Sequence, residues 1–212
     1  MSNSIPFLIN GPSGGLATIV LAHGAGAPMD SEFMEHMATQ LASENIKVVR
    51  FEFPYMSERR KGGSKRPPNR SPQLLSCWNS VLEQLRSEKN LFIGGKSLGG
   101  RIASMIADSH PVKGLTVLGY PFHPPGNPTK TRTSHMEFLR TPCLIVQGER
   151  DTLGNKTEVT RYHLSPNICI RWLPDGDHSF KPRKKSGRTL IQNWDAAVSH
   201  ICLFLEKTIA EA

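Results

Sequence analysis

Short apolar segments of β type alternate along the chain with longer amphipathic segments. Several of the short segments consist almost entirely of Val, Ile, Leu and Phe, which is typical of strands buried on both faces. The alternation predicts an α/β fold with a mostly parallel central sheet of about seven strands and helices on both faces. The predicted strands are Pro6–Ile9, Thr18–Ala22, Lys47–Phe53, Asn90–Gly94, Gly114–Gly119, Cys143–Gln147 and Ile168–Leu173. The predicted helices are Ser31–Ser43, Gln73–Ser87, Leu98–Ser109, Thr157–Tyr162 and Thr189–Glu206.

The length of 212 residues fits one α/β domain that spans residues 1–212. The longest irregular segments are Pro54–Pro72 and Pro121–Thr133, and each follows a predicted strand. Loops at the carboxyl ends of parallel strands form the binding crevice of an open sheet, so we expect both at the functional edge. The fifth and sixth strands are separated by only about two dozen residues. That is enough for one short helix over Thr133–Arg140 but not for a large cap domain.

The pattern Gly-x-Ser-x-Gly occurs twice, at residues 11–15 and 95–99. The pattern alone is weak evidence, because chance produces it in roughly a tenth of chains of this size. Around Ser13 it lies between two strands with no helix after it, which predicts a hairpin turn rather than a nucleophile. Ser97 follows a buried strand and precedes a helical pattern, the setting of a nucleophile elbow. A sharp turn there would lift the hydroxyl out of the sheet, and we predict Ser97 as the nucleophile.

A serine hydroxyl is a weak nucleophile and needs a base that is oriented by a carboxylate. For a serine on this type of turn, the acid and then the base are expected in loops after later strands. His178 is the predicted base, because it follows the last strand in a short loop rich in Gly and Asp. Glu149 and Asp151 share the loop after the sixth strand, and Asp151 is favoured because it stands further beyond the strand. Asp175 and Asp177 are interpreted as solvated turn residues.

An oxyanion hole needs two backbone N–H groups directed at the same point. Leu98, directly after the nucleophile, is predicted to supply one. Ala25 is predicted to supply the other, from a loop of small residues after the second strand. The loops at this edge also suggest the residues that line an open substrate pocket, namely His23, Gly24, Met29, Tyr120, Phe122 and His123.

Four motifs now stand in a fixed order along nearly the whole chain: LAHGAGA, GGKSLGG, VQGERD and DGDHSF. Together they resemble the α/β-hydrolase superfamily. Within it, the chain resembles a compact "predicted α/β-hydrolase" group related to dienelactone hydrolases and to a hydrolase-like domain of a eukaryotic chromatin-regulating subunit. The resemblance implies hydrolysis of carbon–oxygen esters or thioesters. Dienelactone hydrolases use cysteine as the nucleophile, so Ser97 departs from their pattern.

Net charge is +8, and the excess is concentrated in residues 59–70 and 181–188, which follow a strand and His178 respectively. We expect these basic loops at the edge that carries Ser97, where they would steer anionic esters toward the site; two solvated loops are the alternative. No aromatic residues are interleaved with the charges, and no nucleic-acid motif is present, so binding of nucleic acid is not favoured. The start of the chain lacks a secretory pattern, and the four cysteines form no CxxC pair. We therefore expect a cytoplasmic protein with reduced thiols and no contact with a membrane.

The leading hypothesis is a serine esterase or thioesterase that forms an acyl-enzyme and needs no metal or organic cofactor. Its partner would be a small ester or thioester; peptidase or transacylase activity would share the mechanism. The alternative is a binding or scaffold protein on a hydrolase fold, because fold does not guarantee chemistry. The oligomeric state cannot be inferred from the sequence.

Overall fold

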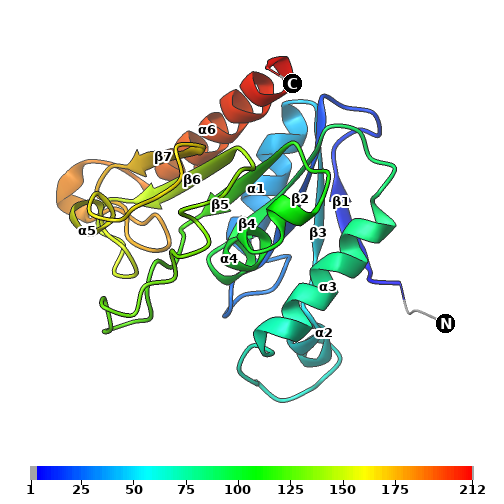
Figure 1. Cartoon of the computed structure of the whole chain (residues 1–212), viewed down its shortest axis with the longest axis horizontal. Helices are drawn as coiled ribbons and strands as arrows, with labels where there is room; N and C mark the ends of the chain where they lie inside the picture. The colour runs from blue at the N-terminus through cyan, green and yellow to red at the C-terminus, as the bar shows by residue number, and fades with distance from the viewer. Residues whose placement is uncertain (1–3, 212) are drawn as a thin grey trace.

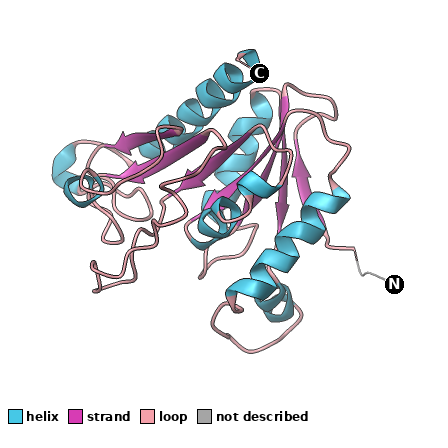
Figure 2. Ribbon diagram, in the orientation of Figure 1, coloured by secondary structure: helices cyan, strands magenta, loops and turns pink. Residues whose placement is uncertain are grey.

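The computed structural model describes residues 4–211, in which seven strands form one sheet in the order β1-β3-β2-β4-β5-β6-β7 (Figures 1 and 2). β1 pairs antiparallel with β3, and the other neighbours are parallel. The strands are β1 Phe7–Asn10, β2 Ala17–Ala22, β3 Ile46–Phe51, β4 Leu91–Lys96, β5 Gly114–Leu118, β6 Cys143–Gly148 and β7 Ile168–Leu173. The predicted fold class is therefore confirmed, with most strand limits within one or two residues.

Helices cover both faces of the sheet, as expected when successive parallel strands are joined by crossovers. They are α1 Glu32–Ser43, α2 Pro54–Arg60, α3 Ser71–Gln84, α4 Leu98–Ser104, α5 Lys156–Val159 and α6 Leu190–Ala210, with 3₁₀ turns at Ala107–Ser109 and Lys184–Ser186. α1 and α6 pack together on one face, and α2, α3 and α4 on the other (Figure 1). Alternate side chains of a strand enter opposite cores; Phe92 and Ile93 of β4 are an example.

Three local predictions are wrong. The segment after β3 begins with helix α2, because Pro54 supplies the preset φ of a first helical residue and Tyr55 and Met56 bury their side chains. Thr133–Arg140 contains turns instead of a helix. The turn around Ser13 joins no hairpin, because β3 lies between β1 and β2 in the sheet.

The topology fixes where the functional loops lie. Because β2 to β7 are parallel, the segments that follow them emerge at one edge of the sheet (Figure 2). This edge receives the segments after β2, β3, β4, β6 and β7, which include every residue predicted for catalysis. No helix within residues 4–211 is both long enough and apolar enough to cross a bilayer.

Candidate active site

Ser97 occupies a strained turn between β4 and α4. Its φ of 49° and ψ of −110° lie outside the regions that side-chain-bearing residues favour, and its N–H donates to the carbonyl of Leu118 at 3.0 Å. A Cβ on Gly95 or Gly99 would lie 2.2 or 2.4 Å from the oxygen of Ala22. Both glycines are therefore required so that β2 can pass close to the turn. This is the strand–turn–helix geometry of a nucleophile elbow.

The structure brings the three predicted catalytic side chains into one hydrogen-bonded chain. Nε2 of His178 lies 2.9 Å from Oγ of Ser97, and Nδ1 lies 2.7 Å from Oδ2 of Asp151. The carboxylate of Asp151 is 0% exposed and the imidazole of His178 is 28% exposed. The ring can therefore exchange a proton with a substrate at its outer side, while its inner side stays bonded to a fixed anion. This is the arrangement in which an imidazole takes the proton of a serine hydroxyl.

Asp151 is held by more than His178. Its Oδ1 accepts a hydrogen bond from the N–H of Leu153 at 2.8 Å, and its Oδ2 accepts one from Nε2 of Gln147 at 2.9 Å. The buried Gln147 also bonds both backbone groups of Tyr120 and the carbonyl of Gly154. Gln147 thus locks the acid-bearing loop against the end of β5. Nothing in the sequence singled it out, because its role depends on which loops meet around it.

Glu149, the other carboxylate of this loop, faces elsewhere. Its Oε1 pairs with Nζ of Lys156 at 3.0 Å, and its Oε2 accepts the N–H of Asp175 at 3.0 Å. Both bonds lower the pKa of Glu149, and the backbone N–H of Asp175 contributes more than Lys156. Asp177 accepts the N–H groups of Ser179 and Lys181, as a turn residue does. Neither residue contacts the imidazole of His178.

The loop after β2 lies against the nucleophile. A Cβ on Gly24 would stand 3.9 Å from Cβ of Ser97. The carbonyl of Gly24 accepts Nδ1–H of His23 at 2.7 Å and the hydroxyl of Tyr55 at 3.3 Å, and that hydroxyl also reaches the carbonyl of Ala25 at 3.1 Å. Nδ1 of His23 must carry the proton, because Nε2 accepts the N–H of Phe53.

These bonds orient the predicted oxyanion donor. In a trans peptide the C=O of Gly24 and the N–H of Ala25 point in opposite directions. Anchoring the carbonyl on His23 and Tyr55 therefore turns the N–H of Ala25 away from them. The N–H of Leu98, at the first position of α4, has no acceptor within the helix. The contact of Tyr55 with this loop was not predicted from the sequence, because α2 was not recognised.

The predicted pocket lining needs correction. His23, Tyr120 and Phe122 are fully buried, and Met29 and His123 are nearly so. They are closed to solvent because they pack in the core: His23 contacts the rings of Phe53 and Tyr55, and Tyr120 contacts Phe122. Of this set, only Gly24 is partly exposed beside Ser97. The buried members support the loops of the site but do not line an open surface.

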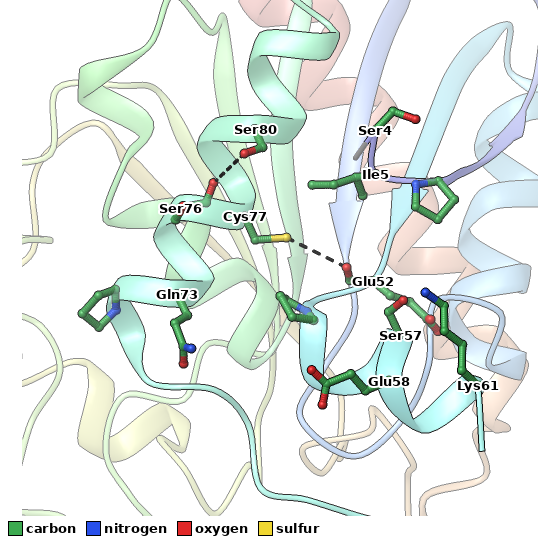
Figure 3. A pocket seen from close by; sticks show the side chains of 13 residues that line it. Ser4, Ile5, Glu52, Ser57, Glu58, Lys61, Gln73, Ser76, Cys77 and Ser80 are labelled. Atoms are coloured by element: carbon green, nitrogen blue, oxygen red, sulfur yellow. Dashed lines mark hydrogen bonds between the residues drawn. The ribbon is translucent and has the colours of Figure 1, made fainter. Parts of the chain in front are cut away.

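A groove of about 700 Å³ lies away from these residues, between α2, α3 and the segment before β1. Figure 3 shows Cys77 and Ser80 facing it from α3, Ser57 from α2, Lys61 from just after α2, and Ile5 from the opposite side. Burial raises the pKa of the Cys77 thiol to about 12, so that thiol is not an activated nucleophile. Neither Ser97 nor His178 lines the groove, and it has no part in the arrangement described above.

Several solved structures share this fold. An α/β serine hydrolase homologue from Coxiella burnetii aligns with a TM-score of 0.71 and 22% identity over 92% of this chain and 90% of its own. A lidless α/β serine hydrolase from Xanthomonas campestris aligns with a TM-score of 0.69 and 20% identity, covering 90% of this chain and 85% of its own. Est1E from Butyrivibrio proteoclasticus aligns with a TM-score of 0.70 and 13% identity, covering 96% of this chain and 94% of its own.

At these identities the structural likeness establishes the fold alone. The family assignment comes from the sequence of the whole domain, since a family model described as "Alpha/beta hydrolase domain" matches residues 15–206. That range contains the elbow at Ser97, the acid-bearing loop after β6 and the loop of His178. The chain belongs to the α/β-hydrolase domain family.

Proposed function

We propose that the protein is a serine hydrolase that cleaves small esters or thioesters through an acyl-enzyme. The observation that carries this proposal is the unbroken chain from Asp151 through His178 to Ser97, with contacts of 2.7 and 2.9 Å. A serine hydroxyl bonded to an imidazole that is itself bonded to a buried carboxylate is the arrangement that activates serine for attack.

The reaction follows from this geometry. Oγ of Ser97 attacks the acyl carbon while Nε2 of His178 takes the hydroxyl proton, and Asp151 stabilises the resulting imidazolium. The N–H groups of Leu98 and Ala25 stabilise the oxyanion, as does the N-terminal end of α4. When the intermediate collapses, the alcohol or thiol departs with the proton from His178. Water, activated by the same imidazole, then releases the acid and restores Ser97.

The resemblance to dienelactone hydrolases bears on the substrate class. Those enzymes use cysteine as the nucleophile, whereas this chain has Ser97. We therefore place cleavage of esters and thioesters ahead of lactone opening. A panel of short and long acyl esters, matching thioesters and one lactone tests this order through kcat/KM.

The basic loops support a preference for anionic substrates. Arg60, Arg66 and Arg183 are paired with carboxylates, but the other eight basic side chains of these loops form no ion pair within residues 4–211. They are exposed or half-buried, and they are Arg59, Lys61, Lys65, Arg70, Lys181, Lys184, Lys185 and Arg188. An uncompensated positive rim raises the local concentration of anions. Esters with a distal carboxylate should be cleaved faster than neutral ones at low salt, and equal rates would refute this preference.

The first experiment is labelling with a fluorophosphonate probe, followed by mass spectrometry to locate the adduct. Labelling of Ser97 in the wild-type protein and its loss in a folded Ser97→Ala variant support the proposal. Ser13→Ala is the matched control, since it alters the serine of the second Gly-x-Ser-x-Gly copy, and it should label like the wild type. Absence of labelling in folded wild-type protein would favour the scaffold hypothesis.

A further inference from the structure

Lys96 immediately precedes the nucleophile, and its ammonium group turns inward beneath the catalytic residues. Nζ donates a hydrogen bond to the backbone carbonyl of His178 at 2.7 Å. It also lies 5.4 Å from the ring centroid of Phe180 and 5.9 Å from that of Phe33. Phe180 belongs to the loop of His178, whereas Phe33 belongs to α1. One ammonium group therefore connects the end of β4 to the loop that carries the base.

The end of β5 is shaped to admit this ammonium. A Cβ on Gly119 would lie 2.7 Å from Nζ of Lys96 and 3.5 Å from Cε1 of His178. Gly119 also has a φ of +72°, which residues with a side chain rarely adopt. The absence of a side chain at this position thus leaves room for both the lysine and the catalytic imidazole.

We propose that Lys96 is a positioning residue that fixes the backbone of His178, so that the imidazole stays aligned with both Ser97 and Asp151. This inference rests on the proposed hydrolase function. Lys96 and Ser97 are neighbours in the chain, so the contact ties the base directly to the segment that carries the nucleophile. Such a tie matters because a displacement of about 1 Å at a reacting group can slow catalysis by about a hundredfold.

The positive charge is retained at a cost. Burial lowers the pKa of Lys96 to about 8, although Asp151 and Asp177 oppose the shift. These carboxylates come from the loops after β6 and β7. Phe33 approaches from α1, and Gly119 lies directly after β5. Replacing a buried charge by an apolar side chain of similar length is often neutral or stabilising. If Lys96 contributed only to packing, an apolar side chain of similar length could therefore replace it without loss of activity.

The test compares Lys96→Met with Lys47→Met, which alters a half-buried lysine of β3 that pairs with Glu88. Lys96→Met should slow fluorophosphonate labelling and ester turnover by about tenfold to a hundredfold, with KM little changed and the melting temperature equal or higher. Amide hydrogen exchange at Ser179 and Phe180 should become faster. Lys47→Met should leave the labelling rate unchanged. An unaltered labelling rate and exchange pattern in Lys96→Met would overturn the inference.

Two further outcomes separate this inference from the proposed function. If wild-type protein is not labelled at Ser97, the proposed function fails, but hydrogen exchange still tests whether Lys96 holds the loop. If Lys96→Met does not fold, the labelling rate of the wild type is followed from pH 7 to pH 10. Loss of the Lys96 proton weakens the donor, so the rate should fall above pH 8 (pKa about 8). A rate that stays level across this range would contradict the inference.

Discussion

Glu149 and Asp151 are separated by one residue in the same loop, yet only Asp151 directs its carboxylate at His178. Oδ2 of Asp151 lies 2.7 Å from Nδ1 of the imidazole, whereas Glu149 bonds Lys156 and the N–H of Asp175. Asp151 is fully buried and Glu149 is partly exposed. The loop therefore directs one carboxylate at the imidazole of His178 and uses the other to anchor the neighbouring loop.

Asp151→Asn and Glu149→Gln should differ sharply in rate. An asparagine cannot stabilise the imidazolium and favours the wrong tautomer of His178, so kcat should fall by about ten-thousandfold. Glu149→Gln should change kcat by less than about tenfold, because its carboxylate does not contact His178. Steady-state kinetics on one ester substrate checks both variants. Comparable losses in the two would refute the assignment of Asp151.

Gln147→Leu should lower both stability and activity. The buried amide of Gln147 bonds Asp151, Tyr120 and Gly154. Leucine would leave the N–H of Tyr120 and the carbonyl of Gly154 without these partners and would remove one of the bonds that hold Asp151. A buried polar group that loses its partner costs about 1–3 kcal/mol, so a loss of roughly 3 kcal/mol in the free energy of unfolding is expected. Urea denaturation measures this loss. Gln40→Leu alters an exposed glutamine of α1 and is the control.

Tyr55→Phe should reduce kcat while KM stays nearly constant. The change removes only the hydroxyl that holds the carbonyls of Gly24 and Ala25. The N–H of Ala25 would then be less well oriented toward the oxyanion, which forms only in the transition state. Complete removal of one oxyanion donor costs about a hundredfold or more, so a partial loss of about tenfold is expected. Tyr162→Phe, which alters a half-buried tyrosine outside this loop, should have no effect on kcat.

Lys96 should make the stability of the protein rise with pH in the alkaline range. Its pKa is about 8 in the folded protein and about 10.4 in an unfolded chain. Between these values the unfolded state binds more protons, so the free energy of unfolding increases with pH. Below pH 8 (pKa about 8) the buried charge of Lys96 lowers the free energy of unfolding by its full amount. The shift in pKa corresponds to roughly 3 kcal/mol.

Urea denaturation of the wild type and Lys96→Met at pH 7 and pH 10 isolates this effect. The difference in unfolding free energy between the two proteins should shrink or reverse at the higher pH, because the wild type alone loses the charged lysine. If the difference in unfolding free energy is the same at both pH values, burial of the charged ammonium group does not destabilise the protein.

Arg60→Met should destabilise the protein more than Arg66→Met. Arg60 pairs with Asp30 and with Glu52, whose side chain is only 4% exposed. The variant therefore leaves the buried carboxylate of Glu52 without its cationic partner. Arg60 itself is 43% exposed, and solvent screening therefore limits the loss to about 1–2 kcal/mol. Arg66 and Glu58 are exposed and 3.6 Å apart, so Arg66→Met should leave the free energy of unfolding almost unchanged. Thermal denaturation compares the two variants.

The sequence predicted the strands well, and the three side chains it proposed as catalytic do lie in hydrogen-bond contact, because both predictions depend on local signals. Near-continuous apolar runs marked β4 and β6, and glycines at fixed spacing marked the turn at Ser97. Helix α2 was missed, since a proline followed by basic residues is typical of a loop until the burial of Tyr55 and Met56 is known. The predicted pocket lining was wrong because the sequence does not reveal which side chains are buried. Aromatic side chains at the end of a strand can face the core as readily as the solvent.

The sequence by itself determined the α/β fold, the identity of the candidate nucleophile and base, and the loops in which they stand. These features follow from periodicity, from the need for glycine at a sharp turn and from the order of strands. Only the tertiary structure decided between Glu149 and Asp151, and only it brought Gln147, Tyr55 and Lys96 to the site. Each of these residues forms a hydrogen bond to a segment distant in the chain, Gln147 to Tyr120, Tyr55 to Gly24 and Lys96 to His178, and such a bond leaves no pattern in either segment alone.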